Sequence, residues 1–173
     1  VVHNRYQRFG GEDMVVDAET DLLRAHGAVV HQLIADSGDP EQMRALKLRP
    51  DRLISNRGAY RETRALIRRH RPEVVHCHNL LPLLGPAVYA AAADERVAVV
   101  QTVHNKRFTC LNGIQLRDGA ECRLCRPGHF LPGIRHGCYR DSHAQSAVLG
   151  VAQAIHHWRG AWRQPDLFVV LSE

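Results

Sequence analysis

The stretch that decides the fold is Val97–Asn105, which reads VAVVQTVHN. Six of its first seven residues are apolar or β-branched, and a run this short is typical of a buried strand rather than a helix. His104 and Asn105 follow this strand at once, and four cysteines come after them. Because ligand sites of open α/β sheets lie at the carboxyl ends of strands, the stretch predicts a reactive edge with a cross-linked segment beside it.

Strand-like and helical patterns alternate along the rest of the chain. Further strands are predicted at Val1-Val2, Val29–Ala35, Val74–His78 and Leu167–Leu171. Helices are predicted at 12–25, 41–47, 60–70, 82–93 and 144–162, with a polar loop from His3 to Gly11. Strands separated by helices predict a Rossmann-like α/β fold, with a parallel sheet and helices on both faces.

Composition indicates one globular domain. The chain has 173 residues, 45% of them hydrophobic, and no apolar run approaches the roughly 18 residues of a membrane span. Its ends read as interrupted elements, since Val1-Val2 resembles the end of a strand and Ser172-Glu173 the start of a helix cap. We therefore expect a piece of a longer protein, and the lack of a signal-like amino terminus favours the cytoplasm.

The net charge of +5 includes an arginine cluster at positions 61–71. Such a run is most often the solvated face of a helix. The alternative is attraction to a phosphate-bearing partner, which covers nucleotides, lipid headgroups at a membrane surface, and nucleic acid.

Two motifs accompany the predicted strand ends. Gly10-Gly11-Glu12 stands between the first strand and the first helix, where a glycine loop and free helical N–H groups suit an anion, although a plain turn explains it equally well. No G-x-G-x-x-G fingerprint is present, which argues against NAD. His76 and His78 are two residues apart on a predicted strand, so their side chains point to the same face. There they suit binding of a metal, contact with a substrate, or a structural hydrogen bond.

The cysteines favour a structural zinc site. Cys122 and Cys125 have the two-residue spacing that lets two thiolates reach one ion, and Cys110 and Cys138 complete a tetrahedral set. Turn signals between Cys110 and Cys122 predict a hairpin that returns the first ligand to the pair. Disulfides, unlinked thiols, and replacement of one sulfur by His129 or His136 remain alternatives. Cys77 is expected to be a buried thiol.

The order of four short motifs resembles the amino-terminal domain of the family 4 glycosyltransferases. The motifs are VHN with GGE near the start, PEVVHCHN at 72–79, VQTVHN at 100–105 and VVLSE at 169–173. The resemblance covers essentially the whole chain, and the cysteines suggest a subset of the family with a Cys-rich insertion. It implies a retaining hexosyltransferase with two Rossmann-like domains, the GT-B fold.

The resemblance also implies roles for individual residues. Gly10 and Gly11, with Glu12, would lie beside the diphosphate of a nucleotide-sugar donor, and His104 would be catalytic at the reacting centre. His78 would belong to the acceptor side of the cleft, and Asn79 and Asn105 would contribute to substrate binding. Residues 1–173 would form the acceptor-side domain, with a Cys-rich insertion at 106–140. A carboxyl-terminal donor domain outside this chain would be the partner, so the chain alone is expected to be inactive.

Two other classes stay open at this stage. One is a non-catalytic, zinc-braced module that binds nucleic acid, which the arginines and cysteines favour but the lack of interleaved aromatic residues opposes, so no nucleic-acid partner is expected. The other is a different Rossmann enzyme. The helical stripe of Val151, Ile155, Trp158 and Trp162 predicts that both tryptophans are buried, in the core or at a domain interface, rather than platforms for a sugar.

Overall fold

The computed structural model describes residues 1–171. The VVLSE motif therefore extends beyond the described residues at Ser172 and Glu173. The chain divides into two compact units. The sheet unit is Val1–His104 with the residues from Gln164 onward, and the cysteine unit is Asn105–Arg163. Within residues 1–171, no helix combines the length and the apolar character that crossing a membrane requires.

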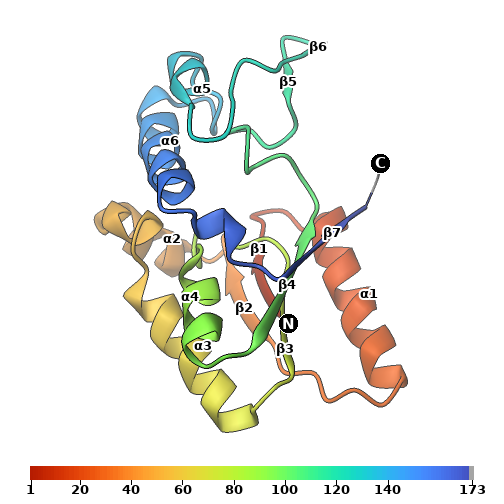
Figure 1. The fold of residues 1–173 in the computed structure, drawn as a ribbon. Coiled ribbons are helices and arrows are strands. Elements are labelled where there is room, and N and C mark those ends of the chain that lie inside the picture. The colour runs from red at the N-terminus through yellow and green to blue at the C-terminus, as the bar shows by residue number, and fades with distance from the viewer. Residues whose placement is uncertain (172–173) are drawn as a thin grey trace. The chain divides into compact units, whose positions relative to one another are not determined.

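The sheet unit is built on five parallel strands in the order β2-β1-β3-β4-β7 (Figure 1). The strands are β1 Val2–Arg5, β2 Leu33–Asp36, β3 Val74–Cys77, β4 Ala98–Val103 and β7 Leu167–Val170. The Rossmann-like α/β fold predicted from the sequence is confirmed. The main correction is in β1, because His3–Arg5 were expected in a loop and instead continue the strand, pairing in parallel with residues 34–36.

Helices cover both faces of this sheet. They are α1 Gly11–Ala25, α2 Pro40–Leu48, the 3-10 helix η1 Pro50–Leu53, α3 Arg57–His70 and α4 Ala87–Asp94. Helix α1 lies on one face, and α3 and α4 lie on the other (Figure 1). Buried Val16 of α1 and Val88 of α4 belong to the core together with the strand residues Val75 and Val99. Helix α4 begins five residues later than predicted because Leu80–Gly85 forms a hydrogen-bonded turn.

The strand order changes direction between β1 and β3. The chain passes from β1 to β2 on one side, and from β3 to β4 on the other. Because the connections after these two strands run in opposite directions, a crevice opens between their carboxyl ends. Doubly wound sheets bind their ligands in such a crevice. The glycine loop follows β1 and His78-Asn79 follow β3, so this topology places both motifs at the crevice.

The cysteine unit consists of short elements around a small core. Its elements are β5 Leu116–Arg117, β6 Ala120–Glu121, α5 Leu131–Arg135, α6 His143–Trp158 and the 3-10 helix η2 Ala161–Arg163. The predicted hairpin is confirmed: β5 and β6 pair antiparallel, and Asp118 and Gly119 between them both have positive φ, as a tight hairpin turn requires. Helix α5 was not predicted, because five residues carry no readable periodicity.

The face of α6 that is buried differs from the predicted one. Trp158 is 85% exposed and Val151 51% exposed, whereas Trp162 is buried as expected. The buried face instead carries small and polar residues, among them Gly150 and Gln153. A Cβ at Gly150 would stand 3.0 Å from Ile134, so α6 packs closely there, and Gln153 bonds the Arg107 carbonyl and the Trp162 indole. Close packing and hydrogen bonds, rather than the apolar stripe, orient this helix.

Candidate functional site

The glycine loop caps helix α1 at the crevice. Gly10 is the residue before the helix, and its N–H donates to Asp13 Oδ2 over 2.9 Å while its carbonyl accepts from Met14 N. Gly11 begins the helix, and a Cβ there would meet nothing within 4 Å. Neither glycine has a positive φ. The backbone therefore does not require glycine here, and the absence of side chains leaves the helix N–H groups open to a ligand.

A buried pair fastens this loop to the sheet. His3 Nε2 lies 2.9 Å from Asp13 Oδ1, and neither side chain has exposed surface. Asp13 thus bonds strand β1 through one oxygen and the Gly10 amide through the other. Sequence reasoning missed both residues. Their only sequence signal is an acid in the first turn of a helix that follows a polar strand end.

Three more histidines gather beside His3. The His78 ring lies 6.1 Å from His3, 4.4 Å from His76 and 5.2 Å from His104, measured between ring centroids. His78 Nδ1 and His104 Nε2 are 2.9 Å apart, so one of these nitrogens donates to the other. His76 Nε2 lies 2.7 Å from Thr102 Oγ1 on the neighbouring strand. His76 and His78 therefore do share one face of the sheet.

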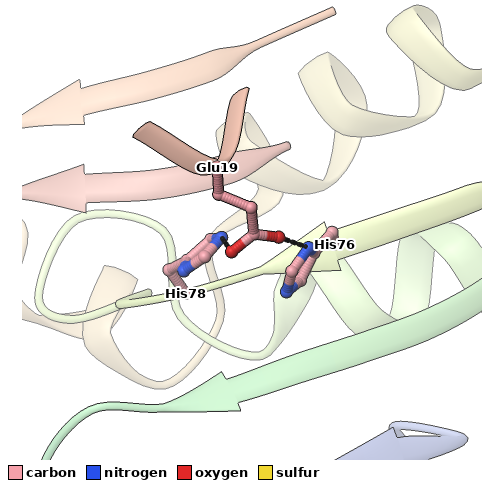
Figure 2. A group of neighbouring side chains, drawn as sticks. All are labelled: Glu19, His76 and His78. Carbon is pink, nitrogen blue, oxygen red and sulfur yellow. Dashed lines mark ion pairs between the residues drawn. The ribbon is translucent and has the colours of Figure 1, made fainter. Parts of the chain in front are cut away.

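The side chain of Glu19, from helix α1, points toward the rings of His76 and His78 (Figure 2). Its Oε1 lies 2.7 Å from His76 Nδ1, and its Oε2 lies 3.8 Å from His78 Nε2. Sequence reasoning missed this carboxylate, although its spacing of three residues from buried Val16 places it on the sheet-facing side of the helix.

Burial sets the protonation of this cluster. It lowers the pKa of His78 to about 3, with further lowering from His76, His104 and His3. Burial also lowers the pKa of His76 and His104, and it raises the pKa of Glu19. The carboxylate of Glu12 acts on the pKa of His104 in the opposite direction, which ties the glycine loop to this histidine electrostatically. At neutral pH His76, His78 and His104 are therefore uncharged hydrogen-bonding groups.

Of the remaining predicted residues, His78, Asn79 and His104 belong to the sheet unit and Asn105 to the cysteine unit. His104 directly follows β4, as the sequence indicated. Asn79 is buried in the strand framework, where its Nδ2 donates to the Asn4 carbonyl and its Oδ1 accepts from Leu81 N. Asn105 begins the cysteine unit, and its Oδ1 accepts from Arg107 N. His78 has a fully buried side chain, so it contacts His104 rather than the surface of the crevice.

The four cysteines of the cysteine unit line one cavity. It encloses about 10 Å³, enough for a single ion but not for an organic ligand, and His136 lines it while Cys110, Cys122, Cys125 and Cys138 provide the sulfurs. Burial raises the pKa of the Cys125 thiol, and the other three cysteines raise it further. All four are free thiols, and no three of their sulfurs lie within 4.8 Å of one another. Cys77 is buried in the sheet unit, as expected.

Comparison with known proteins adds the family. The chain matches the family model described as Glycosyltransferase Family 4 over residues 9–173. Searches of curated proteins and of solved structures each gave no match. The family match spans nearly the whole chain and agrees with the parallel α/β sheet. The chain therefore belongs to glycosyltransferase family 4, and glycosyl transfer is its class of function.

Proposed function

We propose that this chain is the acceptor-side, amino-terminal domain of a retaining GT-B enzyme that moves a sugar from a nucleotide-diphosphate donor to an acceptor hydroxyl. One observation carries the proposal: the glycine loop and His104 both stand at the carboxyl edge of the parallel sheet, and Glu12 couples them electrostatically. A ligand that contacts the free end of α1 would therefore also meet His104.

The chemistry of glycosyl transfer suits these groups. Departure of a nucleoside diphosphate places negative charge on its phosphates, which helix N–H groups stabilise. The open amino end of α1 at Gly11 would provide such donors. His104 is uncharged, and with Nε2 engaged by His78 it would offer its Nδ1 edge to a sugar hydroxyl. His78 would then act as a positioning residue that holds this ring.

The test uses the full-length protein and a panel of nucleotide sugars. Release of nucleoside diphosphate measures turnover, and NMR of the product gives its anomeric configuration. We expect retention, and we expect His104→Ala to lower kcat/KM by about 100-fold, the loss typical of one transition-state contact. His26→Ala, on an exposed histidine at the end of α1, is the matched control and should keep full activity. Inversion of the anomer, or an unchanged rate for His104→Ala, would contradict the proposal.

We also propose that the cysteine unit binds one structural zinc ion through Cys110, Cys122, Cys125 and Cys138. Its support is the shared cavity and the mutual effect of the thiols on the pKa of Cys125, which a divalent cation would offset. Four thiolates leave no open coordination position, so this ion would brace the unit rather than react. Elemental analysis and thiol titration distinguish a zinc site from disulfides and from unlinked thiols.

A further inference from the structure

A second group of metal-ligating side chains lies in the sheet unit, apart from the cysteines. Within residues 1–171, Glu19, His76 and His78 form the group of three whose ligand atoms all lie within 4.8 Å of one another (Figure 2). We propose that these three residues bind a divalent transition metal of the zinc class. This site goes beyond glycosyl transfer and does not depend on it.

The strongest evidence is the Nε2 atom of His78. It is buried and has no hydrogen-bond partner. Buried polar atoms in proteins nearly always have one. The atom faces Glu19 Oε2 at 3.8 Å, which is too long for a hydrogen bond. A cation between this nitrogen and the carboxylate would satisfy both atoms at once.

The spacing of the ligand atoms suits such an ion. Zinc–nitrogen and zinc–oxygen bonds of about 2.0–2.2 Å place tetrahedral ligand atoms roughly 3.4 Å apart. The observed separations are 2.7 Å between Glu19 Oε1 and His76 Nδ1 and 3.8 Å between Glu19 Oε2 and His78 Nε2, on either side of that value. Small rotations of the carboxylate and the two rings are therefore enough to close the site.

Each histidine already has the outer partner that a metal ligand needs. His76 uses Nε2 for its contact with Thr102 Oγ1, which leaves Nδ1 for the metal. His78 uses Nδ1 for its contact with His104, which leaves Nε2. Hydrogen bonds of this kind fix the tautomer and the ring orientation of ligating histidines. Both remaining nitrogens face the Glu19 carboxylate, His76 Nδ1 within contact distance and His78 Nε2 at 3.8 Å.

The ligand set selects the metal. Two imidazole nitrogens and one carboxylate oxygen suit zinc, whereas magnesium and calcium prefer oxygen ligands throughout. Three protein ligands leave a fourth position open. The side chains of His76 and Glu19 are 18% and 28% exposed, so water or an oxygen atom of a small ligand can reach that position.

The experiment counts zinc bound by the full-length protein. Wild type and Glu19→Gln are dialysed against a zinc buffer held below micromolar free zinc, and elemental analysis gives the zinc content per chain. Glu19→Gln keeps the shape of a partly exposed helix residue, so the fold is expected to persist, and circular dichroism checks it. We expect wild type to hold one more zinc ion per chain than Glu19→Gln, whatever the cysteine unit binds.

Competition with a chromophoric chelator then measures affinity. Glu19→Gln and His76→Gln should each weaken zinc binding at this site by more than about 10-fold, the lower bound for losing even an outer-shell partner. Glu62→Gln and His70→Gln, both on α3, are the matched controls and should bind as wild type does. Magnesium should not compete. Equal zinc content and equal affinity in wild type and Glu19→Gln would overturn the site and leave a hydrogen-bonded network, without bearing on sugar transfer.

Discussion

The two units of this chain are stabilised in different ways. The sheet unit has five parallel strands, helices on both faces and a core of fully buried aliphatic side chains such as Val16 and Val88. The cysteine unit has about 60 residues, two-residue strands and a core of Leu111, Phe130 and Leu149. A unit of this size buries little apolar surface and is only marginally stable from its core alone, so small domains are often supplemented by a disulfide or a metal. Regular structure and apolar burial therefore stabilise the sheet unit, and the zinc ion proposed above would stabilise the cysteine unit.

The largest expected effect comes from removing one sulfur. Cys125→Ser should release zinc and unfold the cysteine unit, because structural zinc is worth about 10–16 kcal/mol, as much as the whole stability of a typical domain. Hydrogen exchange should show lost amide protection across 105–163 and retained protection in β1, β3 and β4. Cys77→Ala is the control, since burial raises the pKa of that thiol to about 12 and it lies in the sheet unit. Unchanged amide protection in the Cys125→Ser variant would mean that zinc does not stabilise the cysteine unit.

The same difference explains what the sequence could predict. All five strands of the sheet unit were found from short runs rich in apolar and β-branched residues. Such a run indicated a strand even at β7, whose side chains are exposed. The carboxyl end of β1 was missed because His3 and Asn4 are polar yet buried. Their hydrogen-bond partners, Asp13 and Ser37, lie 10 and 33 residues further along the chain. In the cysteine unit the spacing of the cysteines and the turn residues predicted the hairpin, whereas the burial of α6 depends on close packing at Gly150, which no periodicity reveals.

The candidate site divides in the same way. His104 and the glycine loop could be placed from the sequence because strand ends of a parallel sheet converge at one edge. Glu19 could not, since its role depends on how α1 lies over the sheet. Asn79 is predicted to bind substrate, and that role stays a prediction. Its hydrogen bonds to Asn4 and Leu81, which the sequence did not indicate, hold it in the framework between β1 and β3. A residue such as Glu19, whose contacts depend on how a helix packs on the sheet, can be recognised only when the fold is known.

The next largest effect belongs to the sheet unit. Asp13→Ala leaves His3 and the Gly10 amide without their shared acceptor in a fully buried position. Losing such a partner should lower the free energy of unfolding by about 2–5 kcal/mol, measured by urea denaturation. Asp17 is on the same helix as Asp13 and forms an exposed ion pair with Arg5 of β1. Asp17→Ala should lower the free energy of unfolding by less than about 1 kcal/mol. Equal losses in the two variants would show that the buried pair does not fasten the loop.

A smaller change separates folding from ligand binding at the glycine loop. Gly11→Ala adds a methyl group that meets nothing and needs no change of backbone, so stability should stay equal or rise by up to about 0.5 kcal/mol. Turnover of the full-length enzyme should fall, because the methyl group occupies the space beside the helix N–H groups. Melting temperature and kcat/KM measured on one preparation provide the comparison. Full activity in this variant would mean that the loop is only a turn.

The smallest effect concerns charges on the surface of the sheet unit. Glu95, at the end of α4, bonds Arg64 and Arg68 of α3, and Arg64 is the main cause that holds the pKa of Glu95 below its ordinary value. A lowered pKa means that this stabilisation is present above the ordinary pKa of a glutamate and is lost as pH falls through the folded-state pKa. Glu95→Gln should therefore melt slightly below wild type at pH 7, and the gap should close in acid and shrink in high salt. Glu62→Gln, elsewhere on α3, is the control for the substitution itself. A gap for Glu95→Gln that persists in acid would mean that packing rather than charge joins α3 to α4.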